Sequence, residues 1–535
     1  MATEHFDNND PTQDTVVVRH VPRGGTTNNH ALTVHQKGTG GRGEGLHVQS
    51  ENPGAAAAVV QGAGPLLQLR QADGTVVTEV GNDGSFGNMA MDSLTVADRV
   101  TAGGFVLPQH YPGRRPPYRD ATRVVELFQA GHGWATSGSV DASSNLNDTT
   151  DFVKGTQAAK VVFTGNGNFD KSGISSIDAT DKAFRITLKV DDVTKLSQLN
   201  FRIGTSASNV FQWQLHATTS TSDMFRSGEW TTITFGWADV HSAAGTYSLD
   251  SHRVPSATSG FTFIRLQTVA TGGNCTVHYQ SIELVDNIST TFPNGVVSIV
   301  FDDSWASQWT LARPRMDLYG YRGTNYQITE RVGQAGRLSM AQLRALQDNS
   351  GWEIGGHAYT TALHDNRLTS GTAQQVDDEL RNLRSWMLKN GFYSDSYAYP
   401  GGNFEYTTDG VAIDGLVARY FSSGRTVLTG YGASTNVLSE QWPPTRPYRL
   451  LALSGISDAS GGMGLVSNLV ADGGELDTCK RLGSWLILTL HDITTGSTGG
   501  DDGVITQTDF NTLIDAINSY GIPVLPVGDV MRFVN

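Results

Sequence analysis

The stretch that decides the fold is Gly295–Ser304, GVVSIVFDDS. Five of its six residues 296–301 are apolar, which predicts one strand buried on both faces, as strands of a parallel sheet are. Asp302 and Asp303 follow this run directly. Active sites of α/β barrels lie just past the C-terminal ends of the strands, so one carboxylate can hold a cation there while the other moves a proton. A solvated turn is the alternative interpretation of this pair taken alone.

Three later segments also end a strand-like run with polar or flexible groups. They are Trp352–His357, followed by AYTTALHD with His364; Ser396–Gly402, SYAYPGG; and Leu486–Ile493, LILTLHDI, which contains His491. Amphipathic helices are predicted between them over Ser339–Gln347 and Gln374–Lys389. A parallel barrel whose strand ends converge is the simplest arrangement of these elements.

The remaining predicted strands and helices complete seven or eight strand–helix units. The strands are Gly323–Thr329, Tyr420–Ser423, Tyr448–Ser454 and Ile522–Val527, and the helices are Gly464–Leu482 and Thr506–Tyr520.

Four short motifs in this order resemble those of the NodB-homology polysaccharide deacetylases (carbohydrate esterase family four). They are FDD at Phe301–Asp303, the pair His357 and His364, YPGG at Tyr399–Gly402 and LHD at Leu490–Asp492. The resemblance covers residues from about Gly295 to Asn535. It implies a distorted (β/α) barrel and metal-dependent hydrolysis of N-acetyl groups on a glycan.

The resemblance, together with ligand chemistry, implies a role for each polar residue. Asp303, His357 and His364 are expected to bind a divalent cation, with zinc as the default for His and Asp ligands. Asp302 is the expected general base, and His491 the acid that protonates the departing amine.

The implied oxyanion and substrate residues are Tyr399, Pro400, Gly401, Arg425 and Leu490, with the backbone N–H of Gly401 facing the oxyanion. The third motif lacks the arginine that many family members place near the catalytic aspartate. Arg425, in RYFSSGRT, is expected to supply that charge from a later strand end.

The spacing of the histidine pair departs from the family, which usually has H-x3-H. Here His364 lies three residues further on, and Thr361 occupies the usual second position. Seven residues of straight helix rise about 10.5 Å, too far for two imidazoles on one ion. We therefore expect Ala358–Leu363 to bulge out of regular helix so that His364 reaches the ion. The alternative is that Thr361 replaces the second ligand, which predicts weak metal binding or none.

Composition limits the class of protein. The 535 residues suffice for about three domains, and the net charge of −14 argues against a nucleic-acid partner. With only Cys275 and Cys479, disulfides contribute little or nothing to stability. No apolar run is long enough to span a membrane, and the polar N-terminus lacks the pattern of a signal peptide.

Residues 1–118 are rich in Gly, Asn and Thr and contain short strand-like runs. These runs are Thr15–Arg19, Leu66–Arg70, Thr75–Val80 and Ser93–Val100. The stretches Pro65–Asn88 and Asp92–Phe105 resemble phage minor tail and tail-spike proteins. This resemblance implies an intertwined β shaft, a homotrimer, other tail proteins as partners and a place in the virion tail; a flexible tail is the alternative.

Residues 119–287 are predicted to form an antiparallel β-sandwich that resembles jelly-roll carbohydrate-binding modules in general shape. Four tryptophans either stack on sugars or lie in the core, and the core is the favoured interpretation: Trp134, Trp213, Trp230 and Trp237.

The expected whole is therefore a β-rich shaft (1–118), a sandwich (119–287) and a deacetylase barrel (288–535) acting on an acetylated glycan of a bacterial envelope. Two alternatives stay open. One is a receptor-binding tail protein that holds glycan without turnover, and the other is an exported bacterial deacetylase.

Overall fold

The structure is a computed structural model of the whole chain, in which two compact units, Met1–Gly103 and Gly104–Asn535, can be distinguished. It describes residues 67–70, 76–80, 86–87, 120–216, 225–287, 291–427, 440, 442–456, 465–498 and 503–534. The first unit contains a three-stranded antiparallel sheet in the order β1 (Leu67–Arg70), β2 (Val76–Val80) and β3 (Phe86–Gly87). The strands predicted at Thr15–Arg19 and Ser93–Val100 lie outside the described residues.

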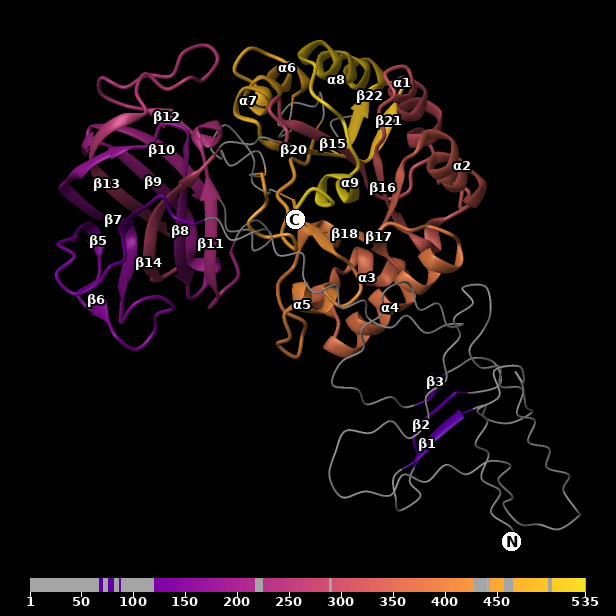
Figure 1. Cartoon of the computed structure of the whole chain (residues 1–535), viewed down its shortest axis with the longest axis horizontal. Coiled ribbons are helices and arrows are strands. Elements are labelled where there is room, and N and C mark those ends of the chain that lie inside the picture. The colour runs from indigo at the N-terminus through magenta and orange to yellow at the C-terminus, as the bar shows by residue number, and fades with distance from the viewer. Residues whose placement is uncertain are drawn as a thin grey trace, which may run out of the picture. The chain divides into compact units, whose positions relative to one another are not determined.

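Antiparallel strands form the first half of the second unit, drawn in violet and magenta in Figure 1. They pair as β11–β8–β14–β7–β13–β9–β10–β12, and β4, β5 and β6 attach at the sides. Their bounds are β4 Arg123–Glu126, β5 Ala135–Val140, β6 Asn145–Asp148, β7 Ala158–Asp178, β8 Lys182–Val190, β9 Leu196–Ser206, β10 Asn209–His216, β11 Trp230–Phe235, β12 Ser242–Ala243, β13 Ser259–Ala270 and β14 Cys275–Asp286. The long strand β7 pairs with β14 through its first residues and with β13 through its later ones, so it connects the two halves of one continuous 11-stranded sheet.

The core enclosed by this sheet is rich in aromatic residues. Trp134, Trp213 and Trp237 are 5%, 0% and 4% exposed and pack among phenylalanines. Trp230 is partly exposed and donates its indole N–H to Asp151 at 2.9 Å. The core interpretation therefore holds for three of the four tryptophans, and they cannot stack on sugars.

Parallel strands form the barrel in the second half of this unit. They pair in the order β19–β18–β17–β16–β15–β20. Their bounds are β15 Val296–Phe301, β16 Thr324–Ile328, β17 Glu353–Ala358, β18 Ser396–Ala398, β19 Ser423–Arg425 and β20 Trp485–Leu490, with the small pair β21 Asp492–Thr494 and β22 Val504–Thr506 nearby. Every residue of β15 is buried, as the run of apolar residues predicts.

The barrel is more irregular than predicted. The expected strand Tyr448–Ser454 makes one bridge to β19, at Leu450, and one to β20, at Leu453. It changes neighbour midway, so no ladder forms on either side. The expected strand Ile522–Val527 is likewise reduced to a single bridge at Val524, and helix α9 follows it. Among the described residues, the barrel thus has six strands and an irregular closing segment.

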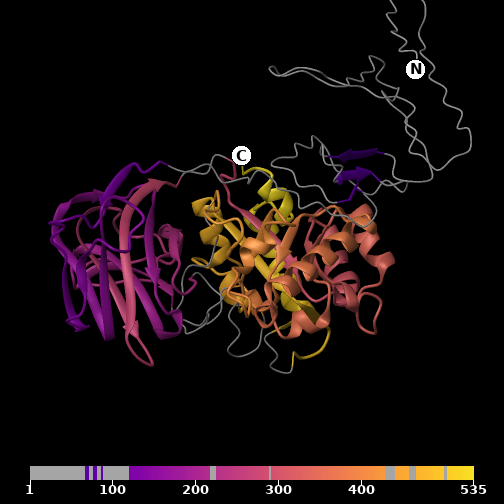
Figure 2. The same ribbon diagram turned by 90° about the horizontal axis from the view of Figure 1, so that it is seen from below.

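Helices cover the outside of the parallel strands (Figures 1 and 2). Their bounds are α1 Arg313–Asp317, α2 Met340–Ser350, α3 Thr361–Asp365, α4 Ala373–Lys389, α5 Ile413–Val417, α6 Val466–Leu469, α7 Glu475–Leu482, α8 Gln507–Tyr520 and α9 Val527–Met531. The helix predicted at Gly464–Leu482 is split in two. Gly473 has φ +72°, and a Cβ at Gly474 would lie 2.2 Å from the Asn468 carbonyl oxygen, so the chain turns there. Of the helices in the described ranges, none has the length and apolar character needed to cross a bilayer.

Candidate active site

The loop after β15 presents two carboxylates at the mouth of the barrel. The backbone N–H of Asp302 donates to the carbonyl of Leu490 at 2.9 Å, which ties this loop to the end of β20. Asp303 and Ser304 then adopt φ values of 68° and 63°. Two consecutive non-glycine residues in the left-handed region are uncommon and turn the chain sharply, so the two aspartates point to different partners.

Asp303 faces both histidines of the second motif. Its Oδ1 lies 3.0 Å from Nε2 of His364 and 3.8 Å from Nε2 of His357. One potential ligand atom from each of the three residues lies within 4.8 Å of the others. Two imidazoles and a carboxylate at this separation suit a divalent cation such as Zn²⁺.

The outer nitrogens of both histidines are held in place. Nδ1 of His357 donates to the carbonyl of Ala398 at 2.8 Å, and Nδ1 of His364 contacts a carboxylate oxygen of Asp365 at 2.7 Å. A carbonyl can only accept a hydrogen bond, so Nε2 of His357 carries the free lone pair toward Asp303. Such outer partners orient metal-binding histidines. Burial also lowers the pKa of His357 to about 4, which keeps the ring neutral.

The chain between His357 and His364 does not form the expected bulge in a helix. His357 lies in β17 and His364 on the short helix α3, whose N-cap is Thr360. The pair therefore never shares one helix, and the ring centroids lie 4.8 Å apart. Thr361 does not face the cluster, because its hydroxyl donates to Glu330 at 2.8 Å.

Asp302 is paired with a buried arginine from β19. Nη2 of Arg425 donates to both carboxylate oxygens at 2.6 Å, and Arg425 is 0% exposed. Burial alone raises the pKa of the Asp302 carboxyl, but the charge of Arg425, followed by His357 and His491, outweighs it and lowers that pKa. The structure thus places Arg425 where the resemblance suggested a charge, and it holds Asp302 ionised.

His491 stands on the other side of Asp302. Its Nε2 lies 4.0 Å from Oδ2 of Asp302, and 29% of its side chain is exposed. Gln308 connects the two loops by donating to the carbonyls of Asp302 at 2.7 Å and His491 at 3.1 Å. Gln308 lies beyond the first motif and has no distinguishing local pattern, so the sequence does not predict this connection.

The YPGG turn supplies Gly401 but not the other expected contacts. Gly401 has φ +60°, a conformation that glycine adopts most easily, and a Cβ there would displace the guanidinium of Arg367. The side chain of Tyr399 is corrected from a substrate contact to a core residue: it is 1% exposed and donates its hydroxyl to the Tyr448 carbonyl. Pro400 and Leu490 are buried as well, so neither side chain is open to substrate.

The polysaccharide deacetylase family model matches residues 289–414, which contain the first three motifs. This match confirms the prediction of a deacetylase domain, a hydrolase, in the C-terminal part of the chain. No curated protein matches the sequence significantly.

Several solved structures share parts of the fold. A Streptococcus pyogenes deacetylase in complex with acetate is 20% identical, over 29% of this chain and 64% of that chain, with a TM-score of 0.24. A family 4 acetyl xylan esterase from Clostridium thermocellum is 14% identical, over 44% and 91%, with a TM-score of 0.26. A family 11 carbohydrate-binding module from a cellulase of Clostridium thermocellum is 12% identical, over 32% and 96%, with a TM-score of 0.23. At these TM-scores we draw no functional conclusion from the likenesses.

Proposed function

We propose that the barrel removes acetyl groups, in the first place N-acetyl groups, from a polysaccharide in a metal-dependent hydrolysis. The observation that carries this proposal is the division of the two neighbouring carboxylates. Asp303 lies 3.0 Å from His364, whereas Asp302 is bound by Arg425 and lies 4.0 Å from His491; His357 lies near both carboxylates, 3.8 Å from Asp303 and 4.0 Å from Asp302.

Asp303, His357 and His364 are the residues that would hold the cation, with zinc as the default. When bound, a divalent cation polarises the amide carbonyl and makes water more acidic. The outer contacts of the two imidazoles support this assignment: Nδ1 of His357 donates to a carbonyl and leaves its Nε2 lone pair free, and Nδ1 of His364 contacts Asp365, the kind of partner that orients a metal-binding histidine.

Asp302 takes the proton of the attacking water in this proposal. Its depressed pKa keeps it ionised at neutral pH, and Arg425 fixes both oxygens without closing their remaining lone pairs. His491 gives a proton to the departing amine, and its partial exposure lets it reach both substrate and solvent. The Gly401 N–H donates to the oxyanion.

Acetate release and metal content test the proposal together. The full chain is freed of metal with a chelator, reloaded with Zn²⁺ and offered N-acetylated and O-acetylated soluble glycans. Acetate release that depends on Zn²⁺ is expected with the N-acetylated glycans. A metal-loaded chain that releases no acetate from any of them would contradict this function and favour the alternative of glycan binding without turnover.

A specific surface of the β-sandwich supports glycan binding as a second function. Side chains on one face of four adjacent strands form two polar rows: Asn168, Gln267, Asn200 and Gln214 in one, and Asp170, Arg265, Arg202 and Gln212 in the other. We call these eight residues the polar face. Planar amide and guanidinium groups suit the paired hydroxyls of sugars.

The groups of the polar face hold one another in position. Arg202 donates to Gln212 at 2.6 Å and to Gln267 at 2.7 Å. Oδ1 of Asn200 and Oε1 of Gln214 are buried and have no hydrogen-bond partner among the described residues. Gln212 and Gln267 are partly exposed, so their amide groups are open to the hydroxyls of a glycan, while the buried Asn200 and Gln214 lie in the row of Gln267. We therefore place the sandwich's binding surface here rather than at its tryptophans.

Calorimetric titration of the full chain with soluble N-acetylglucosamine oligomers and with xylan tests this surface. Gln267→Leu is expected to weaken binding at least about tenfold, because it removes partners of two neighbours at once. Gln347→Leu, on the outside of α2, is the matched control and should bind as the unaltered chain does. Equal affinities of all three proteins would exclude the polar face.

The setting of the protein stays a prediction. The N-terminal resemblance to phage tail proteins implies a virion tail, a homotrimer, other tail proteins as partners and an envelope glycan as substrate. Most of the residues that carry this resemblance lie outside the part of the chain that the structure describes. An exported bacterial enzyme remains the alternative.

A further inference from the structure

A buried arginine of the β-sandwich reaches into the barrel. Arg226 precedes β11 and is 3% exposed. Its Nη2 donates to the carbonyl of Phe404 at 2.6 Å and to Oδ1 of Asp414 at 2.7 Å. Its guanidinium carbon lies 4.9 Å from the ring centroid of Tyr406. All three partners belong to the barrel, so one side chain couples the two domains.

A second arginine completes this contact from the barrel side. Arg449 donates to Oδ2 of Asp414 through Nε at 2.9 Å and Nη2 at 2.7 Å, and also to Glu229 of the sandwich at 2.7 Å. Burial raises the pKa of Asp414, but Arg449 and Arg226 outweigh it and hold the carboxyl ionised. We call Arg226, Glu229, Asp414 and Arg449 the seam cluster.

The seam cluster encloses Phe404, two residues past the end of the YPGG turn. Phe404 is 0% exposed, and its ring centroid lies 5.4 Å from the guanidinium carbon of Arg226 and 4.5 Å from that of Arg449. Only two residues separate Phe404 from Gly401. A ring held from two sides by cations, with its carbonyl also bound, leaves the turn little freedom to shift.

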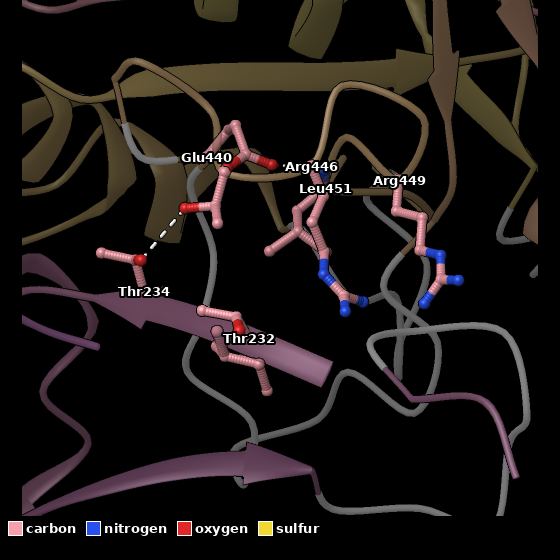
Figure 3. Close-up of a pocket in the computed structure, with 8 residues that line it drawn as sticks. Thr232, Thr234, Glu440, Arg446, Arg449 and Leu451 are labelled. Carbon is pink, nitrogen blue, oxygen red and sulfur yellow. Dashed lines mark hydrogen bonds between the residues drawn. The ribbon is translucent and has the colours of Figure 1, made fainter. Parts of the chain in front are cut away.

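A small cavity beside the cluster is not itself a ligand site. Figure 3 shows Arg446 and Arg449 across from Thr232 and Thr234 of β11. The cavity has a volume of about 30 Å³, which is room for water but not for a sugar ring. The effect of this contact is therefore expected on the barrel loop that contains the YPGG turn and Phe404.

We infer that Arg226 is a positioning residue for the oxyanion donor, so that the β-sandwich completes the active site of the barrel. This inference rests on the proposed deacetylation. Misplacing a catalytic group by about 1 Å can cost roughly 100-fold in rate, so a shift of that size at Gly401 after the loss of Arg226 would be enough to lower turnover. Because Arg226 touches neither the metal-binding cluster nor His491, its loss should lower kcat and leave metal content and KM unchanged.

The test compares two contacts between the same two domains in the full chain. Arg226→Ala removes the contact to the turn. His252→Ala removes a second contact, in which Nδ1 of His252 lies 2.9 Å from Asp477, on the helix α7 and away from the turn. Amide hydrogen exchange of residues 399–407, kcat, KM, Tm and metal content are measured for both variants.

Arg226→Ala is expected to raise exchange in residues 399–407 and to lower kcat by about 10- to 100-fold. His252→Ala should change neither. Arg226→Lys keeps the charge but loses the planar group, so its kcat and hydrogen exchange should lie between those of the unaltered chain and those of Arg226→Ala. This variant distinguishes loss of positioning from misfolding if the alanine variant is unstable.

Unchanged exchange in Arg226→Ala, or the same increase in His252→Ala, would overturn the inference. If the unaltered chain releases no acetate while the exchange result holds, the proposed function fails and the positioning of the turn stands.

Discussion

The mouth of the barrel and its seam with the β-sandwich each contain a buried aspartate held by arginine, and the two carboxylates differ in what is left open. Asp414 at the seam accepts from Arg226 and the Gly415 N–H on one oxygen and from Arg449 twice on the other. A carboxylate has about four acceptor sites, so Asp414 is saturated.

Among the described residues, Asp302 at the mouth accepts one hydrogen bond on each oxygen, both from Nη2 of Arg425. Two acceptor sites remain, and the Nε2 atoms of His357 and His491 lie 4.0 Å from Oδ2. The same residue types therefore form a closed anchor at Asp414 and, in the proposed reaction, a proton acceptor at Asp302. What separates them is the number of unfilled lone pairs, not burial or charge.

The largest effect is expected where the metal-binding cluster itself is removed. Asp303→Ala and His357→Ala should each lose the bound metal, and acetate release should fall to background, because two remaining ligands hold a cation poorly. Metal analysis of purified protein beside an acetate assay is the measurement. A variant with full metal content would show that the cation binds elsewhere.

Asp302→Asn should keep the metal and lower turnover by about 10² to 10⁴, the usual contribution of a general base. The amide can still accept from Arg425 but cannot take the proton. Near-normal kcat with normal metal content would mean that Asp302 is an anchor like Asp414, and the contrast between mouth and seam would disappear.

Variants of His364 and Thr361 test which of these two residues is the remaining metal ligand. His364→Ala should reduce metal affinity strongly, since it removes an imidazole 3.0 Å from Asp303. Thr361→Ala should leave affinity unchanged, because its hydroxyl is directed to Glu330. The reverse ranking in a zinc titration would reject the assignment of His364.

At the seam, a change in stability is expected instead of a change in metal content. Asp414→Asn leaves Arg226 and Arg449 without their charged partner and should lower the free energy of unfolding by on the order of 3 kcal/mol. Denaturant unfolding at pH 7 measures it. Asp317→Asn is the control, because its pair with Arg313 is exposed and should contribute little. Equal midpoints for both variants would mean that the seam cluster does not stabilise the fold.

The smallest effect concerns pH at the second contact between the domains. The hydrogen bond to Asp477 raises the pKa of the exposed His252. Its stabilisation should therefore be complete below the unfolded pKa of about 6.5 and be lost as the pH rises through the folded pKa. The Tm difference between the unaltered chain and His252→Ala should be larger at pH 5.5 than at pH 8.5. A difference that grows with pH would exclude this ion pair.

The sequence predicted most of the mouth because its chemistry lies in short motifs at strand ends. Val296–Phe301 could be read as a buried strand from its apolar residues alone, and Asp302 and Asp303 followed by position. Arg425 could be predicted only because the third motif lacks the arginine that many family members have there. The path of the chain between His357 and His364 was not predicted, because a strand end and a helix N-cap share the same short segment.

The seam could not be predicted, for a different reason. Arg226 and Arg449 are more than 200 residues apart and belong to no motif, and only the docking of two domains brings them onto Asp414. The closing segment of the barrel was misread because Leu450 and Leu453 have the pattern of a strand but pair with different neighbours. Contacts between residues far apart in the chain cannot be predicted from the local sequence around each of them.

The left-handed turn at Asp303 and Ser304 bears on how such a domain can lose its activity. An L-residue in this conformation costs about 1–2 kcal/mol, whereas glycine adopts it freely. One base change converts an aspartate codon to glycine, so Asp303→Gly would relax the backbone while it removes a proposed metal ligand. The relief of backbone strain at position 303 thus favours the folded state of such an inactive variant. In gene copies under no selection for turnover, position 303 is where we expect the loss of activity to begin, with the polar face of the sandwich still intact.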